Sequence, residues 1–406
     1  MPRLPNILWI VTTQWRASAF GYAGDPNART PQLDALAAQS VNYAQAVTPH
    51  PFGPFARAAL LTGVPSPENG VREYFDPLPT SARTIAHELG ARGYATGFFG
   101  KWHLGERDPA ASLVGEAHAK TIVRPEARGG FEFWEGFESG FLLNDPWLHG
   151  TRVAQPEKFS GYQSDVLCNR AAYWVADAEK RGSASWFAVV SLEAPHPPYD
   201  APASGIVPRD PREIILPANV PRGGESEVRA RRELAGYYTH IEATDRAIGT
   251  LLLGDIDPAS TLIIFTSVHG DMHGAHGLFR KGWPYDESVR VPLLVRAPRE
   301  SPRRDDTPIS LVDLPDLTLA AVEKRNPQRE ISFARISMPS VVSLPHQCDR
   351  EWRGVRTPTR KLVLNADGSP WQFFDLASDP LETSNLVNDP LRAGEIADWR
   401  TEVRLN

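Results

Sequence analysis

Basic and imidazole side chains follow several apolar runs that have the composition of buried strands. Lys101 and His103 come after the second run, His196 after the third, and His269 and Lys281 after the fourth, while the neutral amide of Gln14 comes after the first. Because the carboxyl ends of parallel strands meet at one edge of an open α/β sheet, where ligands bind, we expect these side chains to lie together. Clustered ammonium and imidazole groups bind oxyanions and carry acid–base chemistry.

The elements that must position these residues alternate between strand and helix. Continuous apolar runs predict strands at residues 6–11, 94–99, 186–192, 261–266 and 291–296. Helical spacing and capping residues predict helices from residue 31 and over 54–61, 82–93, 164–180, 226–253 and 311–322. This alternation predicts an α/β fold with a mostly parallel sheet and helices on both faces. From residue 330, short strands with turn signals predict a small antiparallel sheet, followed by a helix near residues 390–403.

The bulk composition is that of an ordinary globular protein. The chain has 406 residues, of which 41% are hydrophobic and 23% charged, and its formal net charge is −6. This balance argues against nucleic acid or a membrane surface as the main partner, and no apolar stretch approaches a membrane span. The first apolar run is too short and wrongly flanked for a signal peptide, so we expect a cytoplasmic protein. We predict a main unit at residues 1–329 and a smaller unit at 330–406, and leave the oligomeric state open.

Seven segments, in order, resemble those of the sulfatases, a family of the alkaline phosphatase superfamily. They are PNILWIVT, TPQLDALAAQSV, PFGPFARAALLTG, GKWHLGE, APHPPYDAP, FTSVHGDMHGAHGLFRKGWPYDESVRVPLLV and FFDLASDPLETSNL. The resemblance covers nearly the whole chain and implies the sulfatase fold, a large mostly parallel sheet flanked by helices with a small C-terminal antiparallel sheet. It also implies the family's chemistry, in which a formylglycine made from Cys or Ser attacks a sulfate ester held on a divalent cation, usually calcium.

The nucleophile segment departs from the family pattern. That pattern reads Cys or Ser, any residue, Pro, Ser, Arg, whereas residues 53–57 read Gly-Pro-Phe-Ala-Arg. Arg57 is kept, but Gly53 has no side chain to oxidise, hydrate or attack. His50 is a candidate replacement base, although a loop histidine with a solvated ring is the simpler interpretation. Thr12 and Thr13 offer hydroxyl groups, but the sequence shows no base beside either.

The metal positions depart from the pattern as well. The first strand ends in Thr13 and Gln14 where the family has Asp followed by Asp or Gln, and a later strand ends in Val268 and His269 where it has Asp followed by Asn or His. Gln14 and His269 alone cannot hold calcium, which takes six to eight oxygen ligands. We therefore predict no metal and no cofactor. The spacing of His269 with two later histidines resembles a zinc cluster, but the intervening glycines favour a loop.

The basic residues of the family pattern remain. Losing two carboxylates and one divalent cation together leaves the charge of the site unchanged, so the remaining cations are tolerable if an anion binds between them. Carried over from the resemblance, the predicted catalytic residues are His103, His196, His269 and Lys101. The predicted substrate-binding residues are Arg57, Lys281, Gly53, Thr13, Gln14 and His50.

Three hypotheses about function follow from this pattern. The first is an enzyme that kept the oxyanion pocket and now runs metal-independent acid–base chemistry on a sulfate-, sulfamate-, phosphate- or carboxylate-bearing small molecule. The second is a non-catalytic protein that uses the pocket to hold an anion or to stabilise the fold. The third is an ordinary sulfuric or phosphoric ester hydrolase, which needs a nucleophile and a metal that these motifs lack.

Overall fold

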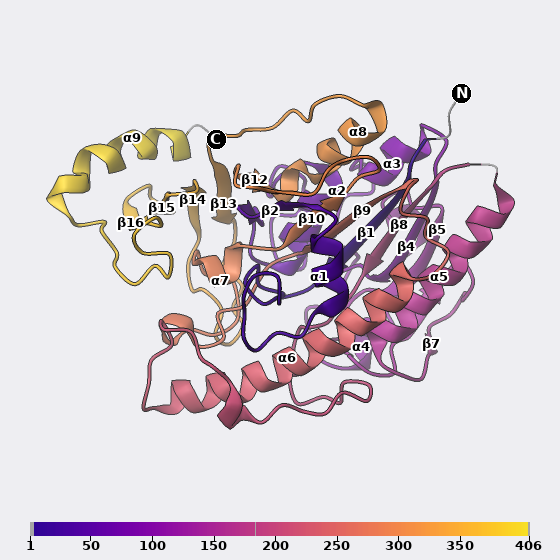
Figure 1. The fold of residues 1–406 in the computed structure, drawn as a ribbon, viewed down its shortest axis with the longest axis horizontal. Coiled ribbons are helices and arrows are strands. Elements are labelled where there is room, and N and C mark those ends of the chain that lie inside the picture. The colour runs from indigo at the N-terminus through magenta and orange to yellow at the C-terminus, as the bar shows by residue number, and fades with distance from the viewer. Residues whose placement is uncertain (1–3, 183, 405–406) are drawn as a thin grey trace.

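A ten-stranded sheet forms the centre of the computed structural model, which describes residues 4–182 and 184–404 (Figure 1). The strand order is β11-β2-β10-β9-β1-β8-β4-β5-β6-β7. Its central strands are parallel: β1 (Asn6–Thr12), β4 (Ala95–Lys101), β5 (Phe133–Phe137), β8 (Trp186–Ser191) and β9 (Thr261–Ser267). All residues of β1, β8 and β9 are buried, as the continuous apolar runs predict. The predicted fold class is confirmed.

The strands outside this central group include antiparallel ones. They comprise β2 (Val41–Tyr43), β6 (Trp147–Gly150), β7 (Glu157–Lys158), β10 (Leu293–Arg296) and β11 (Arg303–Asp305), while β3 (Ala46–Val47) pairs with β12 (Ile309–Ser310). The strand predicted at residues 291–296 exists as β10, but it runs antiparallel to β9. The chain between β9 and β10 holds only short helical pieces, including α7 (Asp286–Val289), so it returns without the long crossover that a parallel neighbour needs.

Helices cover both faces of the sheet. One face packs against α2 (Gly53–Thr62), α3 (Ile85–Gly90) and α8 (Leu314–Glu323), and the other against α1 (Pro31–Ala37), α5 (Gln163–Arg181) and α6 (Glu225–Leu252). Figure 1 shows α5 and α6 side by side. A shorter helix, α4 (Glu116–Ala119), lies in the loop after β4. The alternating residues of β1 explain this arrangement, since Trp9 faces one core cluster and Ile10 the other.

The C-terminal residues form a separate antiparallel sheet, as predicted. It contains β13 (Ala334–Met338), β14 (Trp352–Arg356), β15 (Arg360–Asn365) and β16 (Pro370–Asp375), and it packs against α9 (Ala393–Arg404). Ile336 and Trp352 belong to the core cluster of the main sheet. The buried ammonium of Lys361 pairs with Asp286 and Glu382 at distances of 2.6 and 2.5 Å. The division at residue 330 stays a prediction.

Within residues 4–182 and 184–404, no helix combines the length and the apolar composition that a membrane span requires. The N-terminal residues 1–3, on which part of the signal-peptide argument rests, lie outside the described residues. Cys168 and Cys348 are both buried free thiols.

Candidate active site

Gly53 and His103 lie against each other at the start of α2. A Cβ atom on Gly53 would lie 2.8 Å from Nδ1 of His103, closer than real Cβ atoms approach such a neighbour, and 3.1 Å from its Cε1, which is also a tight contact. His103 follows β4 with a left-handed backbone conformation (φ 59°), and its side chain is buried. The imidazole therefore occupies the space beside position 53 into which a nucleophilic side chain would project.

Gly53→Ser is expected to lower the free energy of unfolding by about 1–3 kcal/mol, because the new Cβ overpacks a buried site. Urea unfolding measures this cost. The same substitution in a His103→Ala background should cost much less, since the clashing ring is gone. An equal cost in both backgrounds would contradict the assignment of the clash to His103.

Arg57 lies one helical turn beyond Gly53 and is held by three acceptors. Its Nη2 donates to Thr13 Oγ1 (2.8 Å), and its Nη1 donates to Ser191 Oγ (2.6 Å) and to the carbonyl of Lys101 (3.1 Å). Burial lowers the pKa of Arg57 to about 10, so the guanidinium stays cationic at neutral pH. Thr13 Oγ1 also donates to the carbonyl of Leu192 (2.9 Å). The Thr13 hydroxyl thus positions Arg57.

Lys101 forms a buried ion pair with Glu193. Its Nζ donates to Glu193 Oε1 at 2.7 Å, and the two side chains are 1% and 0% exposed. The ammonium also lies 4.6 Å from the centre of the Phe141 ring. Burial lowers the pKa of Lys101 to about 8, and Glu193 opposes this change. The cluster of cations is therefore not free of carboxylates, contrary to the charge argument made from the sequence.

Lys281 joins two predicted site residues from other parts of the chain. Its Nζ donates to Gln14 Oε1 at 2.6 Å and to His196 Nε2 at 3.1 Å. His196 Nδ1 lies 2.8 Å from the carbonyl of Pro197 and donates to it, so Nε2 is free to accept. The His196 ring stacks on Phe141 with centroids 4.5 Å apart. Burial lowers the pKa of Lys281 to about 7, and burial and Lys281 hold the pKa of His196 well below its ordinary value.

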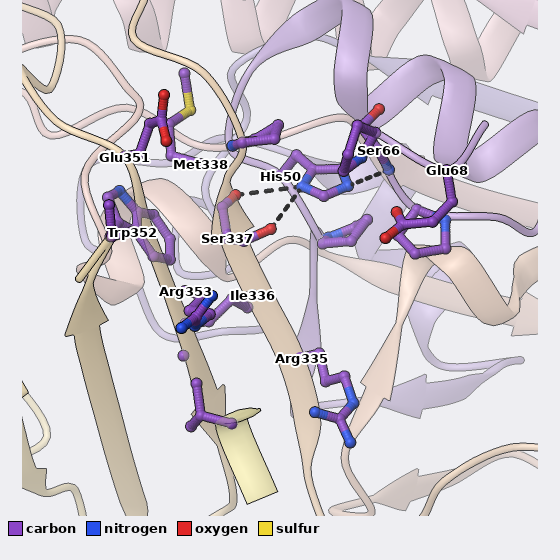
Figure 2. A pocket seen from close by; sticks show the side chains of 17 residues that line it. His50, Ser66, Glu68, Arg335, Ile336, Ser337, Met338, Glu351, Trp352 and Arg353 are labelled. Carbon is purple, nitrogen blue, oxygen red and sulfur yellow. Dashed lines mark hydrogen bonds between the residues drawn. The ribbon is translucent and has the colours of Figure 1, made fainter. Parts of the chain in front are cut away.

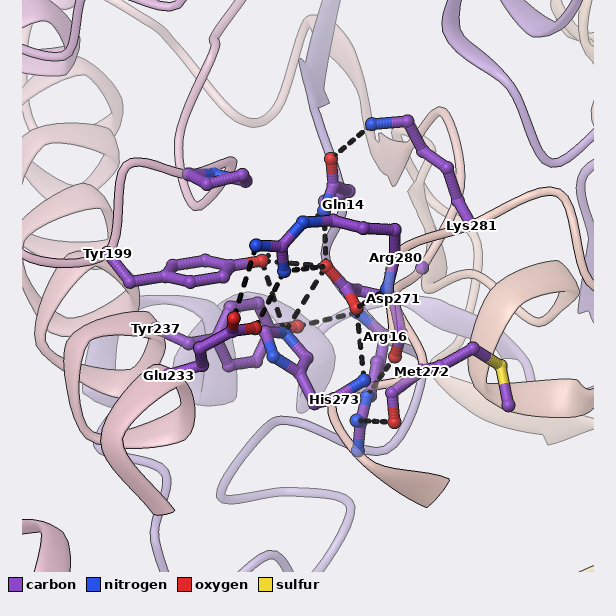
Figure 3. Close-up of polar contacts among 12 residues, drawn as sticks. Gln14, Arg16, Tyr199, Glu233, Tyr237, Asp271, Met272, His273, Arg280 and Lys281 are labelled. Carbon is purple, nitrogen blue, oxygen red and sulfur yellow. Dashed lines mark hydrogen bonds and ion pairs between the residues drawn. The ribbon is translucent and has the colours of Figure 1, made fainter. Parts of the chain in front are cut away.

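Asp271 fixes the orientation of Gln14 (Figure 3). Its Oδ2 accepts hydrogen bonds from Gln14 Nε2 and from the Tyr199 hydroxyl, the latter at 2.7 Å. Its Oδ1 accepts from the backbone N–H groups of His273 and Arg280, each at 3.0 Å. Although burial acts in the opposite direction, His273 and Arg280 hold the pKa of Asp271 well below its ordinary value. With the Gln14 amide nitrogen facing Asp271, its oxygen faces Lys281.

His269 follows β9 and is fully buried. Its Nδ1 lies 2.9 Å from the carbonyl of Gly270, and its Nε2 has no hydrogen-bond partner among the described residues. Burial, and then Lys281, lower the pKa of His269 well below its ordinary value. The ring is therefore neutral at neutral pH.

The residues at the family's metal positions do not fit a divalent cation. Thr13 Oγ1 already accepts from Arg57, Gln14 Oε1 is bound by the Lys281 ammonium, and Val268 is apolar and buried. A second cation at Gln14 Oε1 would repel that ammonium. Across residues 4–182 and 184–404, no three His, Cys, Asp or Glu side chains are grouped as a metal site.

His50 lies apart from this network (Figure 2). Its Nε2 accepts from the backbone N–H of Ser66 at 2.8 Å, and its Nδ1 donates to the carbonyl and hydroxyl oxygens of Ser337 at 3.3 and 3.1 Å. The ring is 1% exposed, lines a cavity of about 270 Å³ next to β13 and β14, and has a pKa lowered by burial to about 4. His50 is thus neither solvated nor joined to Arg57 or Lys101. It links the loop before α2 to β13 of the C-terminal sheet.

Two site carboxylates were missed by reasoning from the sequence. Glu193 and Asp271 stand directly after β8 and β9, in the same strand-end segments that predicted His196 and His269. The signal was their position, and it was overlooked because only basic and imidazole groups were sought. Of the cations Arg57, Lys101 and Lys281, only Lys101 forms an ion pair with one of these carboxylates, and the other two bind neutral acceptors.

Comparison with known proteins identifies the family of this chain. Residues 5–322 match the family described as Sulfatase. The chain is 33% identical to the ulvan-active sulfatase of Formosa agariphila over 96% of this chain and 78% of that protein, and 27% identical to the choline-sulfatase of Rhizobium meliloti over 95% and 83%. Among solved structures, BT4656 in complex with its substrate D-glucosamine-2-N,6-O-disulfate superposes with a TM-score of 0.80 at 19% identity, covering 99% of this chain and 97% of that one. The chain belongs to the sulfatase family.

Proposed function

We propose that this protein binds an anionic small molecule among Arg57, Lys101 and Lys281 and acts on it as a metal-independent acid–base enzyme. The observation that carries the proposal is that only Lys101 of these three buried cations pairs with a carboxylate among the described residues, whereas the hydrogen bonds of Arg57 and Lys281 go to neutral acceptors. A buried charge without a partner is costly, and an oxyanion supplies the missing negative charge through charge-assisted hydrogen bonds. The anionic group is a sulfate, sulfamate, phosphate or carboxylate.

The protonation states in the network support acid–base chemistry. Lys281, with a pKa of about 7, gains and loses its proton near neutral pH, and it already donates to His196 Nε2. Groups that titrate near the working pH are effective acids and bases. His269 Nε2 has a buried lone pair that can accept a hydrogen bond from the ligand, while burial and Lys281 hold its pKa well below its ordinary value. In this proposal Lys281 is the group that gives up and takes back a proton.

A second candidate is ordinary sulfate ester hydrolysis, which family membership and the sulfatase names of the relatives favour. It requires a nucleophile and a metal. Gly53 has no side chain, and Lys281 binds the oxygen of Gln14 at the family's metal position. Turnover of nitrophenyl sulfate at an ordinary enzyme rate of about 1 per second or more would favour this candidate.

The class of molecule that binds this protein is also a proposal. We propose a small-molecule ligand in preference to nucleic acid, which the formal net charge of −6 supports. Cytoplasmic location and the division into two units stay predictions.

The melting temperature is expected to rise with sulfate concentration at constant ionic strength, because the anion binds only the folded state. Arg57→Ala and Lys101→Ala should lose most of this rise, since hydrogen bonds to charged groups contribute about 1.5–3 kcal/mol. Arg83→Ala serves as the control, because Arg83 lies in an exposed pair with Glu88 and should leave the response unchanged. A similar response in all four proteins would place sulfate binding outside the cluster.

A further inference from the structure

Arg107 determines which nitrogen of His103 carries the proton. Arg107 Nη1 lies 2.9 Å from His103 Nε2, and because a guanidinium only donates, Nε2 must accept. Arg107 is itself fixed, since its buried Nε lies 3.4 Å from Glu138 Oε1 and its guanidinium 4.6 Å from the centre of the Tyr74 ring. Burial and the neighbouring cations hold the pKa of His103 well below its ordinary value, so the ring is neutral and its one proton is on Nδ1.

His103 Nδ1 is therefore an N–H donor directed at Gly53. It lies 2.8 Å from the position of a Cβ on Gly53 and has no hydrogen-bond partner in the part of the chain that the structure describes. Arg57 Nε is a second buried N–H donor, and it too has no hydrogen-bond partner among the described residues. Both side chains are at least nine-tenths buried, at 4% and 3% exposure. His103 Nδ1 and Arg57 Nε are thus donors without hydrogen-bond partners among the described residues.

His269 and Glu193 provide hydrogen-bond acceptors in the same network. The carbonyl of Gly270 can only accept, so His269 donates to it from Nδ1 and keeps a lone pair on Nε2. Glu193 binds Lys101 through Oε1, whereas its Oε2 has no partner within residues 4–182 and 184–404. Both side chains are 0% exposed. The network thus also holds two unpaired acceptors.

Contacts between neighbouring elements connect these four groups. Glu193 binds Lys101, whose carbonyl accepts from Arg57, and Arg57 lies on α2 one turn beyond Gly53, against which His103 lies. His269 follows Val268, whose backbone N–H donates to the carbonyl of Thr12, next to the Thr13 hydroxyl that binds Arg57. In addition to burial, Lys281 and Arg57 lower the pKa of both histidines. Buried polar atoms are nearly always paired in folded proteins, and an unpaired one is costly. An anion that has only oxygen acceptors can pair with the two donors but leaves both acceptors without partners.

We propose that the ligand of this site is an oxyanion that carries its own N–H or O–H group on the charged centre, as a sulfamate or a hydrogen phosphate does. This inference rests on the proposed anion site and names its ligand class. The ligand's oxygens accept from Arg57 Nε and His103 Nδ1. Its N–H or O–H donates to His269 Nε2 or Glu193 Oε2. Sulfate esters and alkyl sulfonates have no such donor on the charged group.

Sulfamate and methanesulfonate are matched probes for this inference, because both are monoanions at neutral pH and differ in an amino group against a methyl group of similar size. Calorimetric titration of the full chain at constant ionic strength should show sulfamate binding at least about tenfold more tightly, since the methyl group leaves a buried acceptor unpaired. Equal affinities, or tighter methanesulfonate binding, would overturn this inference and leave the anion site standing. No saturable binding of either probe would overturn the proposed anion site as well.

Substitutions test which atoms of the site cause the preference for sulfamate over methanesulfonate. His269→Phe and Glu193→Gln each remove one acceptor, and at least one of them should reduce the sulfamate preference to about twofold or less. His103→Phe removes a donor that both probes use, so it should weaken both and keep the preference. If His269→Phe and Glu193→Gln both keep the wild-type preference for sulfamate, the assignment of the acceptor to His269 Nε2 or Glu193 Oε2 is overturned. If a variant does not fold, the wild-type comparison of the two probes still decides the inference.

Discussion

The affinity of the protein for sulfate is expected to fall about tenfold per pH unit between pH 7 and pH 8, the slope of a single linked proton, and more steeply above pH 8, where Lys101 also loses its proton. Burial lowers the pKa of Lys281 to about 7 and that of Lys101 to about 8. Asp271 and Glu193 oppose the change at Lys281, whereas Lys101 and Arg280 add to it. Below pH 7 the Lys281 ammonium is present before the anion arrives. Above pH 7 the free protein must take up a proton to bind, so affinity falls.

Calorimetric titration with sulfate between about pH 6 and pH 9 measures this slope, and sulfate itself keeps its charge over the range. Lys281→Met should bind more weakly at pH 6 and show little pH dependence until Lys101 titrates near pH 8. A wild-type affinity that stays constant from pH 6 to pH 9 would show that Lys281 does not change its charge on binding.

The free energy of unfolding of the anion-free protein should rise with pH, whereas the affinity for sulfate falls. The pKa of Lys281 in the folded protein is below its ordinary value of 10.5, so the unfolded chain binds more protons between about pH 7 and pH 10.5. Stability contributed by this residue therefore rises with pH across that window. The difference between wild type and Lys281→Met isolates the contribution from that of other titrating groups.

Asp271→Ala is expected to lower the free energy of unfolding by about 3–5 kcal/mol, the cost of breaking a buried charge network. The carboxylate is 0% exposed and accepts from Gln14, Tyr199 and the N–H groups of His273 and Arg280. All four donors lose a hydrogen bond in this variant, and Arg280 loses one of its two anionic neighbours.

Urea unfolding measures this loss, with Glu106→Ala as the matched control. Glu106 pairs with Arg124 at 3.5 Å, but its side chain is 79% exposed, so its removal should cost about 0–1 kcal/mol. If Asp271→Ala costs no more than Glu106→Ala, the network around Gln14 does not stabilise the fold.

Much of the fold could be predicted because local patterns and tertiary packing agree. The apolar run at residues 6–11 became β1, and the helix predicted at 226–253 became α6 at Glu225–Leu252. The helix predicted from residue 82 begins at Ile85 because the Thr84 side chain accepts from the N–H of Ala86 and caps it there. The direction of β10 could not be predicted, since it depends on the path of the loop after β9.

The site residues that lie at the ends of strands could be predicted from the sequence. Lys101 ends a strand of the main sheet, and Thr13, His196 and His269 follow other strands of it. Arg57 reaches Thr13 and Lys101 from α2. The partners of these residues were harder to predict. His50 pairs with Ser337, which is 287 residues away in a different sheet, and no local pattern predicts that contact.

The central claim is that Arg57, Lys101 and Lys281 bind an oxyanion without a divalent cation. Calorimetric titration of EDTA-treated protein with sulfate, repeated in excess Ca²⁺, tests this claim most directly. The structure predicts saturable binding of equal affinity in both conditions, because the Lys281 ammonium occupies the Gln14 oxygen at the family's metal position. Sulfate binding that occurs only when Ca²⁺ is present would contradict the claim.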